Sequence, residues 1–127
     1  MFGSPSQKAT VEFWLTVPDS LQSLATGILL QQESTKQNKR TDYWTLNQAQ
    51  SPYLWGFVIG NSVKSQIVYS KKLIEYHSDK KYVPYHKIMY KNVPEMLRFM
   101  EDFTGINYPY DALKFIPVSE LKSMGME

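Results

Sequence analysis

Cysteine is absent from this 127-residue sequence, and only two histidines occur, His77 and His86. Without cysteine the chain forms no disulfide bond and no thiolate metal site. The two histidines also do not form H-E-x-x-H, in which histidines four residues apart bind zinc on a helix. Because a metal site needs several ligands, we expect each histidine to be a surface residue rather than a ligand. The sequence therefore predicts that this chain itself binds no metal and no cofactor.

Long apolar runs are also missing. The longest, residues 54–59, is far shorter than the roughly 20 apolar residues that cross a bilayer, and the N-terminal residues contain no apolar signal core. The net charge of +2 at pH 7 is too small to indicate binding to nucleic acid or to a membrane surface. We therefore expect neither of these partners, and the sequence leaves the compartment undetermined.

Charge is unevenly distributed along the chain. Residues 64–91 contain seven lysines against Glu75 and Asp79, whereas residues 92–127 contain six acidic residues against three basic ones. Such a pattern is typical of a solvated surface on which neighbouring charges balance. No catalytic signature accompanies it, since G-x-S-x-G and a glycine-rich phosphate loop are both absent. Adjacent acids such as those at positions 101 and 102 point in different directions on a helix and make a poor acid and base pair.

The first sixty residues have the pattern of β-strands. Apolar and polar residues alternate over residues 11–17, as in a strand with one buried face. Further strands are expected at residues 26–32 and 43–46, joined by an exposed polar loop at residues 33–40. Residues 53–59 are apolar nearly throughout and are predicted to form a strand buried on both faces.

The pattern changes after residue 62. Short strands are expected at residues 63–69, 73–77 and 112–118. Between the second and third of these, one helical stripe is formed by Val93, Met96, Leu97, Met100 and Phe103. Asn92 is a candidate N-cap, and Gly105 supplies the left-handed residue that ends the helix. If helix also precedes this segment, Pro94 is expected to kink or break it.

These patterns predict a β-rich α+β fold. An antiparallel, sandwich-like sheet region occupies residues 1–62, and short strands with one main amphipathic helix occupy residues 63–127. The tyrosines and methionines are expected to pack in and around the core, because basic residues do not alternate with them as on a surface that stacks bases.

Several short segments follow one another in an order that carries a resemblance. They are residues 5–18 with Lys8, Ala9 and Phe13, residues 23–29, residues 51–54 with residues 57–60, Pro94 to Leu97 with Gly105, Tyr108 and Pro109, and finally Gly125-Met126-Glu127. In this order the chain resembles the aminopeptidase N-like zinc metallopeptidases, the gluzincin aminopeptidases, whose exopeptidase motif reads Gly-Ala-Met-Glu-Asn or Gly-Gly-Met-Glu-Asn. The chain departs from the pattern at Gly3-Ser4, where the family has an acidic pair, and at Met124, which replaces the first glycine of the motif.

The resemblance implies a fragment of an enzyme that removes N-terminal residues from peptides. Residues 1–62 would end the N-terminal β domain, and residues 63–127 would begin a thermolysin-like catalytic domain truncated before its zinc motif. Glu127 would bind the free α-amine of the peptide substrate, while Gly125 and Met126 would lie along the peptide backbone. The resemblance places no catalytic residue and no zinc ligand in this chain. Zinc is implied for the parent enzyme, and the chain alone is expected to be inactive.

A second interpretation stays open at this stage. The chain could be a non-catalytic, β-rich module that binds a peptide or protein along an exposed sheet edge. The two interpretations differ in what the gene encodes after Glu127, because the enzyme requires Asn, then H-E-x-x-H and a further Glu. In both, exposed strand edges would favour self-association.

Overall fold

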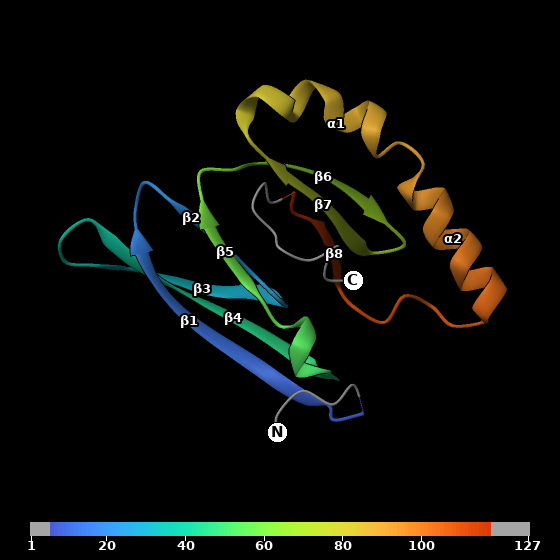
Figure 1. Cartoon of the computed structure of the whole chain (residues 1–127), viewed down its shortest axis with the longest axis horizontal. Helices are drawn as coiled ribbons and strands as arrows, with labels where there is room; N and C mark the ends of the chain where they lie inside the picture. The colour runs from blue at the N-terminus through green and yellow to red at the C-terminus, as the bar shows by residue number, and fades with distance from the viewer. Residues whose placement is uncertain (1–5, 118–127) are drawn as a thin grey trace. The chain divides into compact units, whose positions relative to one another are not determined.

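The computed structural model describes residues 6–117, which divide into two compact units (Figure 1). Among the described residues, the first unit runs to Asn61 and the second comprises Ser62–Pro117. The fold is a β-rich α+β fold with antiparallel sheets and two α-helices in the described part. Each unit is described by itself below.

A three-stranded antiparallel sheet forms the body of the first unit. Its order is β1 (Ala9–Pro18), β4 (Lys39–Gln50) and β3 (Ile28–Thr35), so β4 lies in the centre. Along β1, Val11, Phe13, Leu15 and Val17 are half-buried or buried and the residues between them are exposed, which confirms the predicted alternation. Gly27 precedes β3 with φ of 95°, and a Cβ there would lie 2.1 Å from the carbonyl oxygen of Thr45. Only glycine fits this close approach of two strands.

The predicted loop at residues 33–40 is wrong in extent. Strand β3 continues to Thr35 and β4 begins at Lys39, which leaves a tight turn in which Gln37 and Asn38 have positive φ. Polar residues form this end of the hairpin because both of its faces are exposed and the backbone ladder supplies the pairing. Low apolar content therefore indicated exposure here, and it did not indicate the absence of a strand.

A separate two-stranded sheet pairs β2 (Gln22–Ala25) with β5 (Phe57–Gly60). The sequence patterns did not predict β2, which is too short to show an alternation. The prediction of a doubly buried strand over residues 53–59 is wrong, because Pro52 starts a 3-10 turn, η1 (Pro52–Leu54). Within β5, Phe57 is 53% exposed and Ile59 is 42% exposed. A two-stranded sheet leaves the outer side of these residues uncovered.

The second unit contains a mixed three-stranded sheet in the order β6-β7-β8. Strands β6 (Val63–Tyr69) and β7 (Lys72–Ser78) form a hairpin through Ser70 and Lys71, which both have positive φ as the twist of a two-residue hairpin requires. Strand β8 (Ala112–Phe115) pairs parallel to β7. The connection between them contains η2 (Lys80–Tyr82), α1 (Val83–Met89) and α2 (Val93–Thr104).

The predicted helical region is broken into α1 and α2 at residues 90–92, as expected from Pro94. Asn92 occupies the N-cap position, but its side chain makes no capping hydrogen bond. Gly105 ends α2 in the left-handed conformation, with φ of 69°, which confirms the predicted stop.

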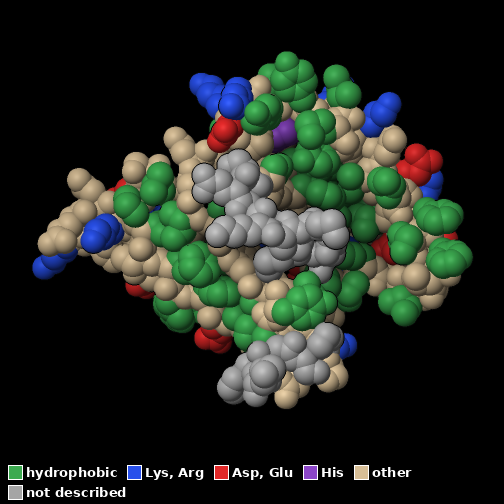
Figure 2. Space-filling view, viewed as in Figure 1, with side chains coloured by type: hydrophobic (Ala, Val, Ile, Leu, Met, Phe, Trp, Pro, Cys, Tyr) green, Lys and Arg blue, Asp and Glu red, His purple; other side chains and the backbone are tan. Residues whose placement is uncertain are grey.

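The predicted apolar stripe of α2 is only partly buried. Met96, Phe99, Met100 and Phe103 are 52 to 77% exposed. The side of α2 that faces inward is narrower and comprises Val93, Leu97 and Glu101. A helix with six apolar side chains besides Pro94 thus buries only part of its apolar surface, and the remainder faces outward (Figure 2).

Candidate functional site

The three residues that the sequence singled out, Gly125, Met126 and Glu127, lie outside the described residues. The described residues nearest to them in sequence are those of β8 and the following Ile116 and Pro117. The chemistry that can be described belongs to the sheet of which β8 is a member.

One face of this sheet gathers four ionisable side chains. In the antiparallel pair, Lys64 is opposite His77, and in the parallel pair Glu75 is level with Lys114. Because side chains two residues apart on a strand share a face, Glu75 and His77 point the same way as both lysines. Lys64 Nζ donates to Glu75 Oε1 at 3.2 Å, and His77 Nε2 lies 3.2 Å from Glu75 Oε2. We call these four residues the Glu75 cluster.

Glu75 is the charged centre of this cluster. The hydrogen bond from His77 and the positive charges of Lys64 and Lys114 lower the pKa of Glu75 from 4.5 to about 2, although burial of the carboxyl opposes this shift. Glu75 is therefore a carboxylate at neutral pH and accepts the Nε2 proton of His77. His77 is only 3% exposed, and its Nδ1 is buried without a hydrogen-bond partner among the described residues. The cluster thus contains one unused ring nitrogen.

Lys114 is the second unusual group of the cluster. Burial lowers its pKa from 10.5 to about 8, and the nearby positive charge of Lys64 adds to this effect, while Glu75 opposes it. A lysine with such a pKa exchanges its proton close to physiological pH. The Glu75 cluster therefore has a buried carboxylate and a buried imidazole at its centre, with the exposed Lys64 at its edge.

The other face of the sheet holds the second histidine. His86 of α1 is 5% exposed, with Nε2 2.6 Å from Ser78 Oγ and Nδ1 2.9 Å from Ser65 Oγ. Ser78 Oγ donates to the carbonyl of Asp79, so it accepts the Nε2 proton and Ser65 donates to Nδ1. His86 therefore ties α1 to both β6 and β7. Its neighbour Tyr90 stacks on a sheet tyrosine, with ring centroids 4.2 Å apart.

Both histidines are thus buried, and the prediction that they are surface residues is wrong. The signal that was available is the spacing of Glu75 and His77, which places a carboxylate and an imidazole on one face of a strand. The contribution of Lys114 could not be found in this way, because it depends on the parallel pairing of a strand far along the chain. The serines that hold His86 belong to two different strands and have no sequence signature.

A serine beside a histidine can act as a nucleophile and base, but the Ser78 and His86 pair lacks the third group of such a site. The partner that orients the ring is the hydroxyl of Ser65, and it carries no charge to stabilise an imidazolium. Within residues 6–117 no group of three or more His, Cys, Asp or Glu side chains could hold a metal ion.

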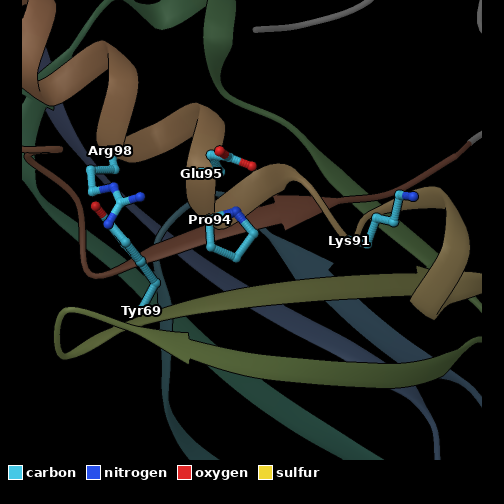
Figure 3. A pocket seen from close by; sticks show the side chains of 5 residues that line it. All are labelled: Tyr69, Lys91, Pro94, Glu95 and Arg98. Atoms are coloured by element: carbon cyan, nitrogen blue, oxygen red, sulfur yellow. The ribbon is translucent and has the colours of Figure 1, made fainter.

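An open pocket lies where β6 ends beside the start of α2. It has a volume of about 400 Å³ and is lined by Tyr69, Lys91, Pro94, Glu95 and Arg98 (Figure 3). Its charged side chains are of both signs and all are exposed. Tyr69 donates its hydroxyl proton to Glu101 at 2.9 Å and is therefore already engaged. The pocket offers a polar surface and no group arranged for catalysis.

Comparison with known proteins adds no relative. No family model matches the chain, and no curated protein matches it. Within residues 6–117, none of the helices has both the length and the apolar character that crossing a bilayer demands.

Proposed function

We propose that this chain is part of a zinc-dependent aminopeptidase, and that Glu127 binds the free α-amine of the peptide substrate. In this proposal the first unit ends an N-terminal β domain and the second unit begins the catalytic domain. Zinc, bound by the parent enzyme, would supply a Lewis acid and an activated water. This chain would contribute the carboxylate that selects a free N-terminus.

The observation that carries the proposal is the path of the chain from α2 to β8. Gly105 ends α2 in the left-handed conformation, Tyr108 and Pro109 follow, and β8 then joins the sheet as an edge strand among the described residues. The backbone N–H of Tyr108 donates to Glu101 of α2 at 2.7 Å, which fixes this turn. The same order of helix, glycine, Tyr-Pro and strand precedes the exopeptidase motif in the family that the sequence resembles. The sequence following β8 includes Gly125, Met126 and Glu127.

A carboxylate is suited to the role proposed for Glu127. Facing an ammonium group in a desolvated site, it makes a charge-assisted hydrogen bond and rejects substrates without a free amine. Gly125 would let the substrate backbone approach closely because it has no Cβ, and Met126 would continue the strand beside the peptide.

The gene sequence and an activity assay test this proposal together. The codons after Glu127 are expected to encode Asn, then H-E-x-x-H and a further Glu. In the complete encoded protein, Glu127→Gln should lower kcat/KM for aminoacyl p-nitroanilides by about 100-fold, because a charged pair is lost in the transition state. Glu12→Gln, at an exposed position of β1, is the matched control and should leave the rate unchanged. A stop codon after Glu127, or full activity of Glu127→Gln, would contradict the proposal.

The alternative is a β-rich module that binds a peptide or protein through a sheet edge. One observation favours it, namely that β3 is an edge strand exposed along its whole length and carries exposed Ile28, Leu29 and Leu30. Such an edge can pair with an extended peptide through its backbone. A natural stop after Glu127 together with saturable binding of an extended peptide, abolished by proline in β3, would favour this module over the enzyme.

A further inference from the structure

Lys114 is an amine of the Glu75 cluster that the proposed peptidase does not use. It lies on β8, level with Glu75 of β7 in the parallel pairing, so its side chain shares a face of the sheet with Lys64 and His77. The residue is half-buried, and burial is the largest cause of its lowered pKa. Lys114 therefore combines a nucleophilic nitrogen with a position that is partly shielded from water.

The cluster contains more cationic groups than Glu75 can neutralise. Lys64 Nζ donates to Glu75 Oε1, and His77 Nε2 lies beside Glu75 Oε2, each at 3.2 Å, so both carboxylate oxygens already have a partner. The positive charge of Lys64 acts on Lys114 and disfavours a second ammonium group. Loss of a proton from the half-buried Lys114 relieves this repulsion, whereas the side chain of Lys64 is 46% exposed and its charge is solvated.

Two features of its surroundings activate a lysine as a nucleophile, namely removal of its charge from water and a neighbouring positive charge. Lys114 has both. With a pKa of about 8, roughly a tenth of the Lys114 side chains are the neutral amine at pH 7. For an ordinary exposed lysine this fraction is below about one in a thousand. At neutral pH the cluster thus makes Lys114 a far more abundant neutral amine than a solvated lysine.

We propose that Lys114 is a nucleophilic lysine that forms an imine with small aldehydes. Its nitrogen attacks the carbonyl carbon, a C–N bond forms, and the carbonyl oxygen takes up a proton released by the nitrogen. The resulting carbinolamine loses its hydroxyl group and the second hydrogen of the nitrogen as water, which leaves a C=N bond. The carbon keeps its oxidation state, so the step requires no oxidant or reductant. The inference does not depend on the proposed peptidase activity.

Reductive trapping on the 127-residue chain tests the proposal. Acetaldehyde with sodium cyanoborohydride converts each imine into an N-ethyl lysine, and mass spectrometry of chymotryptic peptides gives the rate at each site. At pH 7 we expect Lys114 to be ethylated at least about 10-fold faster than the exposed Lys36, because far more of it is neutral amine. The ratio of the two rates should fall by roughly 10-fold between pH 7 and pH 9, where most of Lys114 is already neutral.

Substitution of the two neighbours should change this ratio in opposite directions. Lys64→Met removes the neighbouring positive charge and should lower the ratio of Lys114 to Lys36 about 3-fold, whereas Glu75→Gln removes the charge that favours the ammonium form and should raise it about 3-fold. Lys80→Met, at an exposed position of the second unit, is the matched control and should leave the ratio unchanged. Circular dichroism checks that each variant folds.

The wild type in concentrated urea supplies a control that needs no variant. There the preference for Lys114 should vanish, because unfolding removes both its burial and its charged neighbours. Equal rates at Lys114 and Lys36 in the native chain, a preference that persists in urea, or an unchanged ratio in folded Lys64→Met would each overturn the proposal.

Discussion

Among the described residues each unit buries one carboxylate, and the two are held in different ways. In the first unit Asp42 is fully buried and accepts hydrogen bonds from Ser23 at 2.6 Å, from Gln32 at 2.9 Å and from Arg40 at 2.9 Å. Burial raises the pKa of Asp42, but these three hydrogen bonds and the charge of Arg40 outweigh it and the net pKa is lowered. In the second unit Glu75 is held by two lysines and a histidine.

The two networks differ in whether the groups around the carboxylate have further hydrogen-bond partners. Around Asp42, Ser23 also accepts the indole proton of Trp44, and Arg40 also donates to the carbonyls of Asp19 and Leu21. Around Glu75, burial lowers the pKa of the partner Lys114 to about 8, and Nδ1 of His77 has no hydrogen-bond partner among the described residues. The first network fixes a structure, whereas the second responds to pH. Of the two networks, the Glu75 cluster of the second unit is therefore the better candidate for a functional site.

The largest expected loss of stability comes from substituting the two buried carboxylates, Asp42 and Glu75. Asp42→Ala should lower the free energy of unfolding of the first unit by about 4 kcal/mol, because it leaves buried donors unpaired. Glu75→Gln should cost the second unit about 3 kcal/mol at pH 7, because Lys64 and Lys114 lose their counter-charge. All three tryptophans lie in the first unit, so their fluorescence reports that unit alone, while seven of the nine tyrosines lie in the second, so near-ultraviolet tyrosine dichroism follows mainly the second. Equal loss in both signals for either variant would contradict separate networks.

The second largest effect is expected in acid, where the second unit should lose stability because of Glu75. The folded pKa of Glu75 is about 2 against 4.5 for an unperturbed glutamate, so its contribution is fully present above pH 4.5 and is lost as the pH falls toward 2. The loss should reach about 3 kcal/mol in the second unit. Denaturant titrations at pH 6, 4 and 2.5 measure it. In Glu75→Gln this part of the pH dependence should disappear, and an unchanged dependence would show that other carboxyls cause it.

The smallest effect is expected on the alkaline side. Between pH 8 and 10.5 the unfolded chain binds more protons at Lys114 than the folded chain, so the stability of the second unit should rise with pH in this window. Lys114→Met should raise stability by about 1 kcal/mol at pH 7, because a buried charge is removed, and should abolish the rise. Lys36→Met, at an exposed turn of the first unit, is the control. A wild-type free energy of unfolding that stays constant between pH 8 and 10.5 would refute the lowered pKa of Lys114.

Local patterns predicted strands where a single face is buried, and the end of a helix where a glycine stops it. The alternation in β1, the hairpin of β6 and β7, the break before Pro94 and the stop at Gly105 were all available from neighbouring residues. The exposure of Phe103 and the burial of His77 were not, because each depends on what lies opposite in three dimensions. The Glu75 cluster in particular needs the register of three strands. The predicted substrate-binding residues stay a prediction.

The parallel pairing of β8 with β7 has a kinetic consequence. The hairpin of β6 and β7 closes through two residues, Ser70 and Lys71, whereas β8 pairs with β7 across residues 79–111, which contain both helices. Closing such a long connection costs more chain entropy and delays contact formation. Strand β8 should therefore be the last strand of the second unit to be protected from hydrogen exchange during refolding. In this order of folding the hairpin of β6 and β7 forms first. Strand β8, which precedes Glu127 in the sequence, joins the sheet last.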